Sequence, residues 1–489
     1  MIGEFLLIEK DWILNKSSLI PLHQQIYEFM KRKIINGEWT VGTKIPTQRD
    51  LAKKFNVNRS TIVYALDELS ADGLIESKVG RGTFVVNNTW NLLASIPPPD
   101  WNSYVKSGSY QPNNKTIQEI NRAEINPNVI RLGTGELSPE LLPVKEMEQM
   151  FKRHSPHSFS LGYSEPKGSL YLREMISNYL KTKKIEVSPT SIMIVSGGLQ
   201  ALQLISLGLL HRDSTIFLET PSYLNSVHVF QSAGMNLLGI PMDEEGIRPK
   251  SIGRLKKQHK GALLYTIPTF HNPTGILMSA TRRKELLDVC KNEKLPIIED
   301  DVYGDLWFEN PPPNPLKSID YQGLILYIGS MSKTLSPGLR IGWIVGPEPV
   351  IDRLADIKMQ TDYGSSSLSQ FIVAEWLSSG LYDEHVKKIR TELKFRRDFT
   401  LEILNTHFTQ LATWNIPQGG FYIWVQIKKQ TSIRKLFEKA LNEGILLNPG
   451  NIYDHNDQIH LRLSYAYASL HELKKGLIRL SELIEEISN

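Results

Sequence analysis

Residues 330–334 read Ser330-Met331-Ser332-Lys333-Thr334; they follow the apolar run 324–328 (LILYI) and precede Pro337-Gly338-Leu339-Arg340. A short apolar run is typical of a buried strand, so this lysine is expected just past a strand end. A lysine that forms a Schiff base must lie on a rigid element and lose its proton easily, which nearby positive charge favours. The serine hydroxyls and the guanidinium suit a phosphate dianion. Taken alone, such a stretch is more often a solvated turn.

Four further polar fragments follow apolar runs upstream of this one. They are residues 196–200 (SGGLQ), 219–223 (ETPSY), 268–275 (PTFHNPTG) and 299–303 (EDDVY). Continuous apolar strands separated by helices predict a mostly parallel sheet that is covered on both faces. The carboxyl ends of such strands meet at one edge, where α/β proteins bind ligands. Each fragment alone has an ordinary explanation as a turn or a core tyrosine, but five in order are hard to explain in that way.

The fragments also suit one kind of ligand chemically. A carboxylate in the 299–303 fragment can keep a pyridine nitrogen protonated, which makes the ring an electron sink. Backbone N–H groups of Gly198 and Leu199 at a helix start can bind phosphate. Tyr223 can stack on a planar ring, and Asn272 offers an amide donor.

From about residue 128 to the C-terminus, these fragments resemble the fold-type I, pyridoxal phosphate-dependent aminotransferases. The resemblance implies an α/β domain over residues 128–489, with a mostly parallel large-lobe sheet and a smaller α+β lobe over roughly 350–489. It implies that Lys333 is the catalytic residue, which forms the internal aldimine with pyridoxal 5'-phosphate. The domain is expected to form a homodimer.

The resemblance also assigns the remaining site residues by matching position. Arg462, in the stretch 460–464 (HLRLS), is expected to clamp a substrate α-carboxylate by a bidentate pair. The expected cofactor contacts are Asp300 at the pyridine nitrogen, Tyr303 and Asn272 at the phenolic oxygen, Tyr223 on the ring face, and Gly198, Leu199, Ser330, Ser332, Arg340 and the neighbouring subunit's Tyr163 (162–168, GYSEPKG) at the phosphate.

Three features depart from this pattern or compete with it. Leu199 stands where a polar residue is more usual, so only its backbone N–H can serve the phosphate. No second arginine can be identified for a side-chain carboxylate, which leaves the amino-group donor open. His154 and His157 raise the question of a metal site, but no Cys or carboxylate cluster lies nearby, so two surface histidines and no metal are expected.

A second pattern occupies residues 15–87. Leu22, Ile26, Phe29, Met30 and Ile34 have helical spacing, and Gly37 can end that helix. A short helix then starts at residues 46–50 (PTQRD), where Thr47 can cap and Asp50 can accept from the Thr47 backbone N–H. A third helix, from residue 58 or 59, carries its apolar positions inward at Ile62, Ala65, Leu66 and Leu69.

Two short helices joined by a tight turn form a helix-turn-helix, whose second helix enters the DNA major groove. Arg59, Ser60, Thr61 and Tyr64 fall on the outer, N-terminal face of that helix. Two short β runs then flank residues 79–82 (VGRG), which predicts a hairpin "wing" with Arg81 at its tip. From residue 31 to 81 there are ten Lys and Arg against six Asp and Glu, an excess of four that equals the charge of the whole chain, +4.

Charge alone favours a different explanation, a small helical bundle with a solvated charged face. The order of the elements favours DNA binding, and three stretches resemble the winged helix-turn-helix of the GntR regulators: 44–52 (KIPTQRDLA), 58–61 (NRST) and 80–85 (GRGTFV). The resemblance implies that Arg49, Arg59 and Arg81 are the chief DNA contacts. Residues 88–127 between the two patterns are polar and rich in Pro, Gly and Asn, and are expected to be a linker.

The composition restricts the class of protein and the cellular compartment that are expected for this chain. With 22% charged and 41% hydrophobic residues the chain is not of a strongly disordered, collagen-like or disulfide-scaffold type. A single Cys fits a reducing compartment. No apolar run approaches the roughly 18 residues that cross a bilayer, and no secretory signal is recognisable, so a cytoplasmic protein is expected.

A winged helix joined to an aminotransferase-like domain resembles the MocR (GabR-like) subgroup of GntR regulators over nearly the whole chain. The resemblance implies a homodimer that binds double-stranded operator DNA, carries pyridoxal phosphate and responds to an amine or amino acid. One alternative is an active aminotransferase whose DNA-binding part is incidental or autoregulatory. Another is that the winged helix docks a protein.

Overall fold

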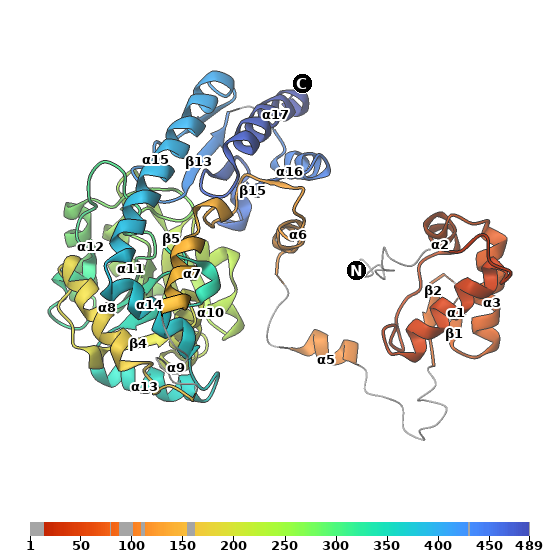
Figure 1. Cartoon of the computed structure of the whole chain (residues 1–489), viewed down its shortest axis with the longest axis horizontal. Coiled ribbons are helices and arrows are strands. Elements are labelled where there is room, and N and C mark those ends of the chain that lie inside the picture. The colour runs from red at the N-terminus through yellow and green to blue at the C-terminus, as the bar shows by residue number, and fades with distance from the viewer. Residues whose placement is uncertain are drawn as a thin grey trace. The chain divides into compact units, whose positions relative to one another are not determined.

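The computed structural model describes residues 14–78, 80–87, 101–108, 113–153, 162–428 and 431–488. The chain divides into two compact units, residues 1–108 and 109–489, here called the N-terminal and the C-terminal unit. Figure 1 shows the elements of each unit, coloured along the chain.

The described part of the N-terminal unit includes the three helices and the hairpin that were predicted. They are α1 (Leu22–Ile35), α2 (Gln48–Phe55), α3 (Arg59–Ala71), β1 (Ile75–Lys78) and β2 (Gly82–Val85), with a short helix α5 (Trp101–Ser107) further along. Ile26, Phe29, Ile34, Ile62 and Leu69 belong to one buried cluster, so the helical spacing seen in the sequence marks the core face. Gly37 has a φ of +75°, a conformation that favours glycine after a helix end.

The start of α2 differs from the prediction in one detail. The Thr47 side chain accepts from the Asp50 backbone N–H, as expected of a cap. The Asp50 carboxylate accepts from the Thr47 hydroxyl at 2.6 Å, where a bond from the Thr47 backbone N–H is expected. The two side chains are therefore joined directly, and the helix start is still fixed.

An eight-stranded, mostly parallel sheet forms the large lobe of the C-terminal unit, in the order β4-β11-β10-β9-β8-β5-β6-β7. The run from β10 to β6 is parallel, whereas β11 is antiparallel to β10 and β4, and β7 is antiparallel to β6. The strands are β4 (Ile192–Val195), β5 (Thr215–Thr220), β6 (Asn236–Asp243), β7 (Gly246–Ile247), β8 (Gly261–Thr266), β9 (Ile297–Asp300), β10 (Ile325–Ser330) and β11 (Gly342–Val345).

Helices cover both faces of this sheet, because neighbouring residues of each strand point to opposite sides. Ile297 belongs to one buried cluster and Ile298 to another. One face carries α7 (Val144–Arg153), α8 (Leu170–Thr182), α11 (Ile252–His259), α12 (Ala280–Asn292) and α14 (Ser367–Ser378); the other carries α9 (Gly198–Leu209), α10 (Val229–Ser232) and α13 (Glu348–Met359).

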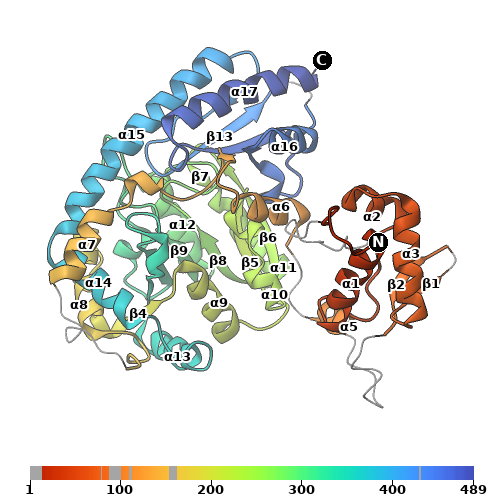
Figure 2. The same ribbon diagram turned by 45° about the vertical axis from the view of Figure 1, so that its right-hand side comes forward.

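The small lobe is an antiparallel sheet, β12-β13-β16-β15, with three helices. Figure 2 shows α15 and α17 lying side by side above β13. The elements are α15 (Leu381–His407), β12 (Ala412–Trp414), β13 (Tyr422–Ile427), α16 (Ile433–Asn442), β14 (Ile445–Leu446), β15 (Asn448–Pro449), β16 (His460–Ser464) and α17 (Leu470–Ser488), and β3 (Ile130–Arg131) pairs in parallel with β14.

Two helices inside the range expected for the small lobe, α13 and α14, pack instead on the large lobe. Ile351 of α13 and Ile372 of α14 are buried in clusters shared with the eight-stranded sheet. The apolar faces of these helices thus cover strands that lie far away in the sequence, and the small lobe begins with α15.

Part of the stretch expected to be a linker is helical and packs on the C-terminal unit (Figure 2). This helix, α6 (Lys115–Ala123), buries Ile117 and Ile120 in the main core cluster. Arg434 of α16 donates to Glu119 at 3.0 Å and to Thr116 at 3.1 Å. The average composition of residues 88–127 conceals two isoleucines three positions apart, which is enough for one buried helical face.

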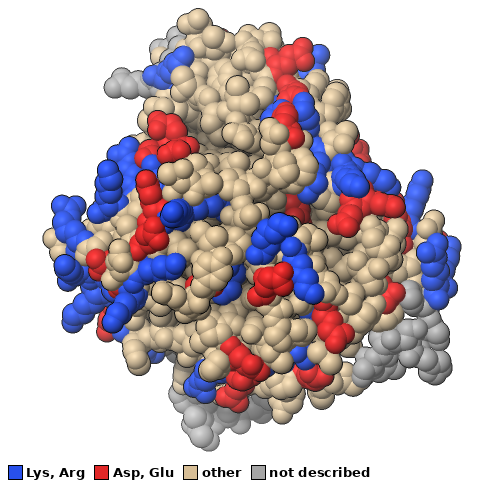
Figure 3. Space-filling model, turned by 90° about the vertical axis from the view of Figure 1, so that its left-hand side faces the viewer, with Lys and Arg blue, Asp and Glu red and all other residues tan. Residues whose placement is uncertain are grey.

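Short 3-10 helices complete the described elements, at Pro139–Leu141, Pro189–Ser191, Tyr223–Ser226, Pro249–Ser251, Leu316–Ile319, Pro337–Leu339 and Gly450–Ile452. On the face in Figure 3, basic and acidic side chains are interspersed. None of the described helices is long and apolar enough to cross a membrane.

Candidate functional site

The loops that follow five strands of the large sheet converge on one cavity of about 420 Å³. They are the loops after β4, β5, β8, β9 and β10, which is the arrangement expected from the five sequence fragments. The predicted residues that line the cavity are Gly198, Leu199, Tyr223, Asn272, Asp300, Tyr303, Ser330, Ser332, Lys333, Arg340 and Arg462.

Lys333 lies just past the end of β10, and its amine points at a backbone carbonyl. Its Nζ donates a hydrogen bond to the carbonyl oxygen of Gly135 at 2.7 Å. Gly135 comes from the segment after β3, far from Lys333 in the sequence. The lysine is thus held by a neutral acceptor inside the cavity.

Asp300, the last residue of β9, is buried, and only one of its two carboxylate oxygens has a hydrogen-bond partner among the described residues. Its Oδ2 accepts from the Tyr265 hydroxyl at 2.7 Å, whereas its Oδ1 has no hydrogen-bond partner among the described residues. Burial raises the pKa of this carboxyl to about 6, and the Tyr265 hydrogen bond opposes the rise. A cationic N–H at Oδ1 would supply the missing partner and favour the ionised form.

Arg340, Ser330 and Ser332 line the cavity together with Gly198 and Leu199, the first residues of α9; the N-terminus of a helix favours anions. Arg340 donates from Nη2 to the Ser196 carbonyl at 2.7 Å. Gly197 has a φ of +92°, and a Cβ there would come within 2.6 Å of Arg340 Nη2, so only glycine lets the guanidinium approach. The Ser330 hydroxyl donates to that of Ser332 at 3.0 Å. Together these groups form a donor-rich cradle for an anion.

Arg462 lies on β16 at the opposite side of the cavity, and its guanidinium is positioned by neutral groups. It donates from Nη1 to Asn272 Oδ1 at 2.8 Å and from Nη2 to the Gly133 carbonyl at 2.6 Å. It also lies over the ring of Tyr422, 4.1 Å from the centroid, while its Nε has no partner among the described residues. No carboxylate of the described chain forms an ion pair with it, which leaves its charge for a ligand.

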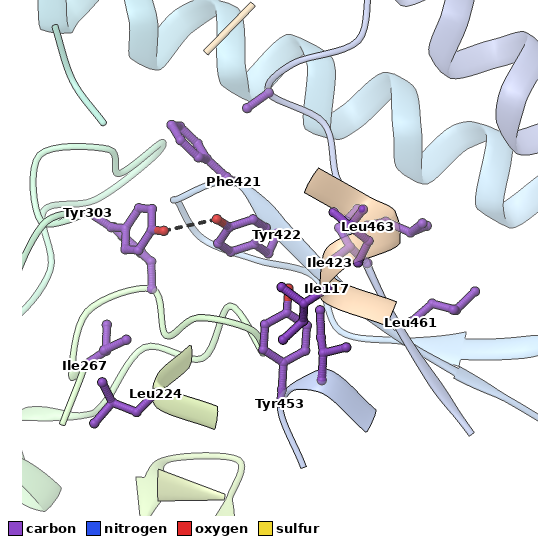
Figure 4. Close-up of a cluster of buried hydrophobic side chains, with 14 of the residues drawn as sticks. Ile117, Leu224, Ile267, Tyr303, Phe421, Tyr422, Ile423, Tyr453, Leu461 and Leu463 are labelled. Atoms are coloured by element: carbon purple, nitrogen blue, oxygen red, sulfur yellow. Dashed lines mark hydrogen bonds between the residues drawn. The ribbon is translucent and has the colours of Figure 1, made fainter. Parts of the chain in front are cut away.

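Tyr303 and Asn272 are in contact, as a shared role requires, although their hydrogen bond is long at 3.5 Å. Figure 4 shows the Tyr303 hydroxyl pointing at that of Tyr422, and the two oxygens are 3.1 Å apart. Tyr223 is half-buried beside them, and its pKa is raised to about 12, chiefly by burial. Leu199 lines the cavity, and its side chain is 46% exposed.

Sequence reasoning missed Tyr265, Tyr422, Tyr453 and the segment 133–136. Tyr265 and Tyr422 lie inside apolar strands, where a tyrosine is ordinarily a core residue. They belong to the site only because of the residues that they contact in the folded chain, and nothing in the sequence around them indicates this.

Tyr163 lies outside the cavity. Its side chain is 83% exposed, and its ring packs on Tyr363 with 5.3 Å between the ring centroids. Among the described residues no three metal-binding side chains come together. His154 and His157 lie outside the described residues.

The predicted DNA-contacting residues lie on α2, α3 and the hairpin of the N-terminal unit, and most of them are exposed. Arg49, Arg59, Ser60 and Arg81 are exposed, Tyr64 is 63% exposed, and Thr61 is half-buried. Arg59 donates from Nε and Nη2 to Gln48 Oε1 at 3.0 and 2.9 Å, so α2 and α3 are joined by these side chains. Arg81 lies in the turn of the hairpin, next to Gly80 and Gly82.

Comparisons with known proteins match both units. Residues 22–85 match the family "Bacterial regulatory proteins, gntR family", and residues 127–480 match "Aminotransferase class I and II". The described fold and site therefore define a GntR-type regulator joined to an aminotransferase-like domain.

Two relatives match this chain over nearly their whole length. The chain is 57% identical to the "uncharacterized HTH-type transcriptional regulator YdfD" of Bacillus subtilis strain 168, over 97% of this chain and 98% of the relative. It is 37% identical to the HTH-type transcriptional regulator NorG of Staphylococcus aureus, over 91% of this chain and all of the relative. The chain belongs to this family of transcription regulators, the MocR/GabR-like members of the GntR family.

Among the solved structures similar to this chain are two aminotransferases. Kynurenine aminotransferase of Pyrococcus horikoshii, in complex with PMP, gives a TM-score of 0.74 at 29% identity, over 79% of this chain and 98% of that one. LysN, the α-aminoadipate aminotransferase of Thermus thermophilus, gives 0.73 at 28% identity, over 80% and 99%.

Proposed function

We propose that this protein is a cytoplasmic, homodimeric transcription regulator that holds pyridoxal phosphate, binds operator DNA through its winged helix and responds to an amine or amino acid. The observation that carries the proposal is the presence, in one chain, of an exposed arginine-bearing winged helix and a cavity that combines Lys333, Asp300 and Arg462.

The chemistry of the cavity fits pyridoxal phosphate. Asp300 Oδ1 is a buried acceptor without a partner among the described residues, which suits a protonated pyridine nitrogen. The cradle of Arg340 and the two serines suits the phosphate, and the glycine at 197 leaves room for the Arg340 guanidinium. Tyr223 offers a ring face, and Tyr303 with Asn272 offers donors for the phenolic oxygen. The amine of Lys333 would hold the aldehyde carbon.

When bound, pyridoxal phosphate supplies an electrophilic carbon and an electron-withdrawing ring. The chain's own residues then have separate tasks. Asp300 would keep a proton on the ring nitrogen, Lys333 would hold the aldehyde end of the cofactor, and Arg462 would orient a ligand α-carboxylate by two parallel hydrogen bonds. Tyr422 and Tyr453, stacked on the guanidinium, exclude water from that charge.

Regulation follows from linkage between the two units. If the ligand-bound and ligand-free states differ in their affinity for DNA, then DNA changes the affinity for the ligand by the same factor. In a dimer, two winged helices can reach two half-sites, and the exposed Tyr163 is free to contact the cofactor phosphate of the neighbouring subunit.

The deciding experiment compares the binding of the full-length protein to DNA from upstream of its own gene and to random duplex, at about 0.15 M salt. We expect clear preference for the upstream DNA, and a change in that affinity when an effective amine is added. Equal binding to both duplexes would contradict the proposal.

A second candidate is an active aminotransferase that also binds DNA. It is favoured by Arg462, because its guanidinium is in position for a substrate carboxylate, although an amino-acid effector needs the same group. Steady turnover with an oxo-acid acceptor, near the enzyme median of about 10 s⁻¹, would favour the enzyme. A single half-reaction, or none, would favour the sensor.

A further inference from the structure

Two carboxylates that line the cavity, those of Glu124 and Glu136, have no role in the proposed binding of the cofactor. The described cationic side chains that line it are Lys333, Arg340 and Arg462, and each has a place in the proposed function. Asp300 serves the pyridine nitrogen. Glu124 and Glu136 also line the cavity, and the proposed function assigns them no role.

Both glutamates are associated with the segment 133–136, which also lines the cavity. Glu124 follows the last turn of α6, and its Oε1 accepts from the Thr134 hydroxyl at 2.8 Å. Glu136 is exposed to the cavity and has no hydrogen bond or ion pair with the described residues. Thr134 and Glu136 flank Gly135, whose carbonyl accepts from Lys333.

The same segment also contacts the carboxylate clamp, since the Gly133 carbonyl accepts from Arg462. A ligand held between Lys333 and Arg462 therefore lies along residues 133–136. Such a ligand then shares the cavity with two negative charges, that of Glu136 within this segment and that of Glu124, which is hydrogen-bonded to Thr134 of the segment.

A buried acceptor in the same cavity points independently to a donor-bearing ligand. Asn448 lines the cavity with only 6% of its surface exposed, and its Oδ1 has no hydrogen-bond partner among the described residues. It lies beside Gly133, because a Cβ at residue 133 would meet Asn448 Oδ1 at 2.0 Å. Buried polar atoms without a partner are rare in proteins, and a bound ligand is one way to satisfy them.

We propose that the ligand of this site is an amino acid or amine whose side chain carries a second positive charge, held by Glu124 and Glu136. This inference rests on the proposed function and specifies its ligand class. A cationic group makes charge-assisted hydrogen bonds with both carboxylates. An anionic side chain of the same length is repelled, and a neutral one leaves the carboxylates to water, so the cavity selects by charge.

Binding of such a ligand would also act on α6. Ile117 and Ile120 of this helix line the cavity, and Figure 4 shows Ile117 next to Tyr453. A cation bound by Glu124 thus lies at the end of α6, the helix that leads from the linker into the C-terminal unit. A change in ligand binding can therefore reach the chain between the two units through α6.

The test titrates the full-length, pyridoxal phosphate-loaded protein with matched ligands and follows the visible absorbance of the cofactor. L-Lysine and L-ornithine carry the second charge, L-norleucine and L-norvaline are neutral analogues of similar length, and L-glutamate is anionic. We expect the basic amino acids to bind at least about 10-fold more tightly than the neutral ones. We expect L-glutamate to bind most weakly.

Two variants and a matched control assign the preference to these residues. Glu124→Gln and Glu136→Gln should each reduce the ratio of lysine to norleucine affinity several-fold, and the double variant should bring it close to one. Glu244→Gln changes an exposed glutamate outside the cavity, and it should keep the wild-type ratio. Thermal unfolding of each variant checks that the fold is retained.

If lysine and norleucine bind with equal affinity, or if glutamate binds more tightly than both, the inference about a cationic ligand is overturned. The proposed function is still supported in that case, provided that the amino acids change the absorbance of the cofactor. A uniform gain in affinity for every α-amino acid in Glu124→Gln also overturns the inference, because this glutamate would then merely screen Arg462. If no amine changes the absorbance of the cofactor, the proposed function fails as well.

Discussion

Asn272 Oδ1 accepts a hydrogen bond from Arg462 Nη1 at 2.8 Å, so a residue expected to contact the cofactor directly orients the residue expected to contact the ligand. Asn272 comes from the loop after β8 in the large lobe, and Arg462 from β16 in the small lobe. The cofactor side and the ligand side of the cavity are thus connected by one side-chain amide.

Replacing Arg462 by lysine should separate the binding of carboxylates from the binding of amines. Lysine keeps the charge but cannot make two parallel hydrogen bonds. We expect Arg462→Lys to weaken the binding of L-alanine by at least about 10-fold, or 1.4 kcal/mol. Ethylamine, which lacks the carboxylate, should bind as it does to the wild type. Equal weakening of both ligands, measured by absorbance titration, would mean that Arg462 only maintains the structure.

Lys333→Ala should abolish the visible absorbance that develops when pyridoxal phosphate is added to the cofactor-free protein. The amine that points into the cavity is then lost, while the phosphate cradle remains. Lys284→Ala, at an exposed position of α12, is the control and should behave as the wild type. Persistence of the absorbance in Lys333→Ala would show that another amine holds the cofactor.

Arg59→Ala should lower the affinity for the specific DNA by about 1–3 kcal/mol for each base contact that is lost. Arg32 is exposed on α1 and is not among the predicted DNA contacts, so Arg32→Ala removes the same charge without the contact. We expect that control to lose only a small amount of affinity, equally for specific and random duplex. A footprint that is unchanged in Arg59→Ala would exclude base reading by this residue.

Asp300 should make the stability of the cofactor-free protein depend on pH. Its pKa in the folded state is about 6, above its ordinary value of 3.8, so the folded protein holds a proton that the unfolded chain has lost between these values. Stability from this group is therefore highest at low pH and falls as the pH rises toward 6.

The variant Asp300→Asn cannot ionise and removes this dependence. From about pH 5 to about pH 7.5, its free energy of unfolding should rise relative to that of the wild type by about 1.4 kcal/mol. Urea unfolding of both proteins at the two pH values measures this difference. The contribution of Glu299, whose pKa burial raises to about 7, is present in both proteins and largely cancels. A difference that does not change with pH would show that Asp300 is ionised throughout.

The sequence was sufficient for those parts of the site that follow strand ends. Asp300, Lys333 and Tyr223 each come after an apolar run, and parallel strands bring such positions to one edge. Arg59 and Arg81 could be predicted for a similar reason, since short helices and a hairpin with glycines leave few choices of orientation.

The remaining features depend on contacts between segments that are distant in the chain. Tyr265 supports Asp300 from a neighbouring strand, and Gly135 accepts from Lys333 across the gap between β3 and β10. Glu124 becomes a cavity residue only because α6 packs on the core, and the polar average of residues 88–127 hides that helix. The spacing of apolar residues predicts which face of a helix or strand is buried, but it does not predict which segment of the chain that face contacts.

The position of α6 also determines where the winged helix of one such regulator can be joined to the aminotransferase-like domain of another. The cavity includes Ile117, Ile120 and Glu124, which all precede the stretch 127–480 that matches the aminotransferase family. A chimaera that exchanges winged helices between relatives with the junction at residue 127 would carry these three side chains into a foreign cavity. Its ligand preference would then change together with its operator preference. A junction upstream of Lys115 would leave each ligand cavity whole.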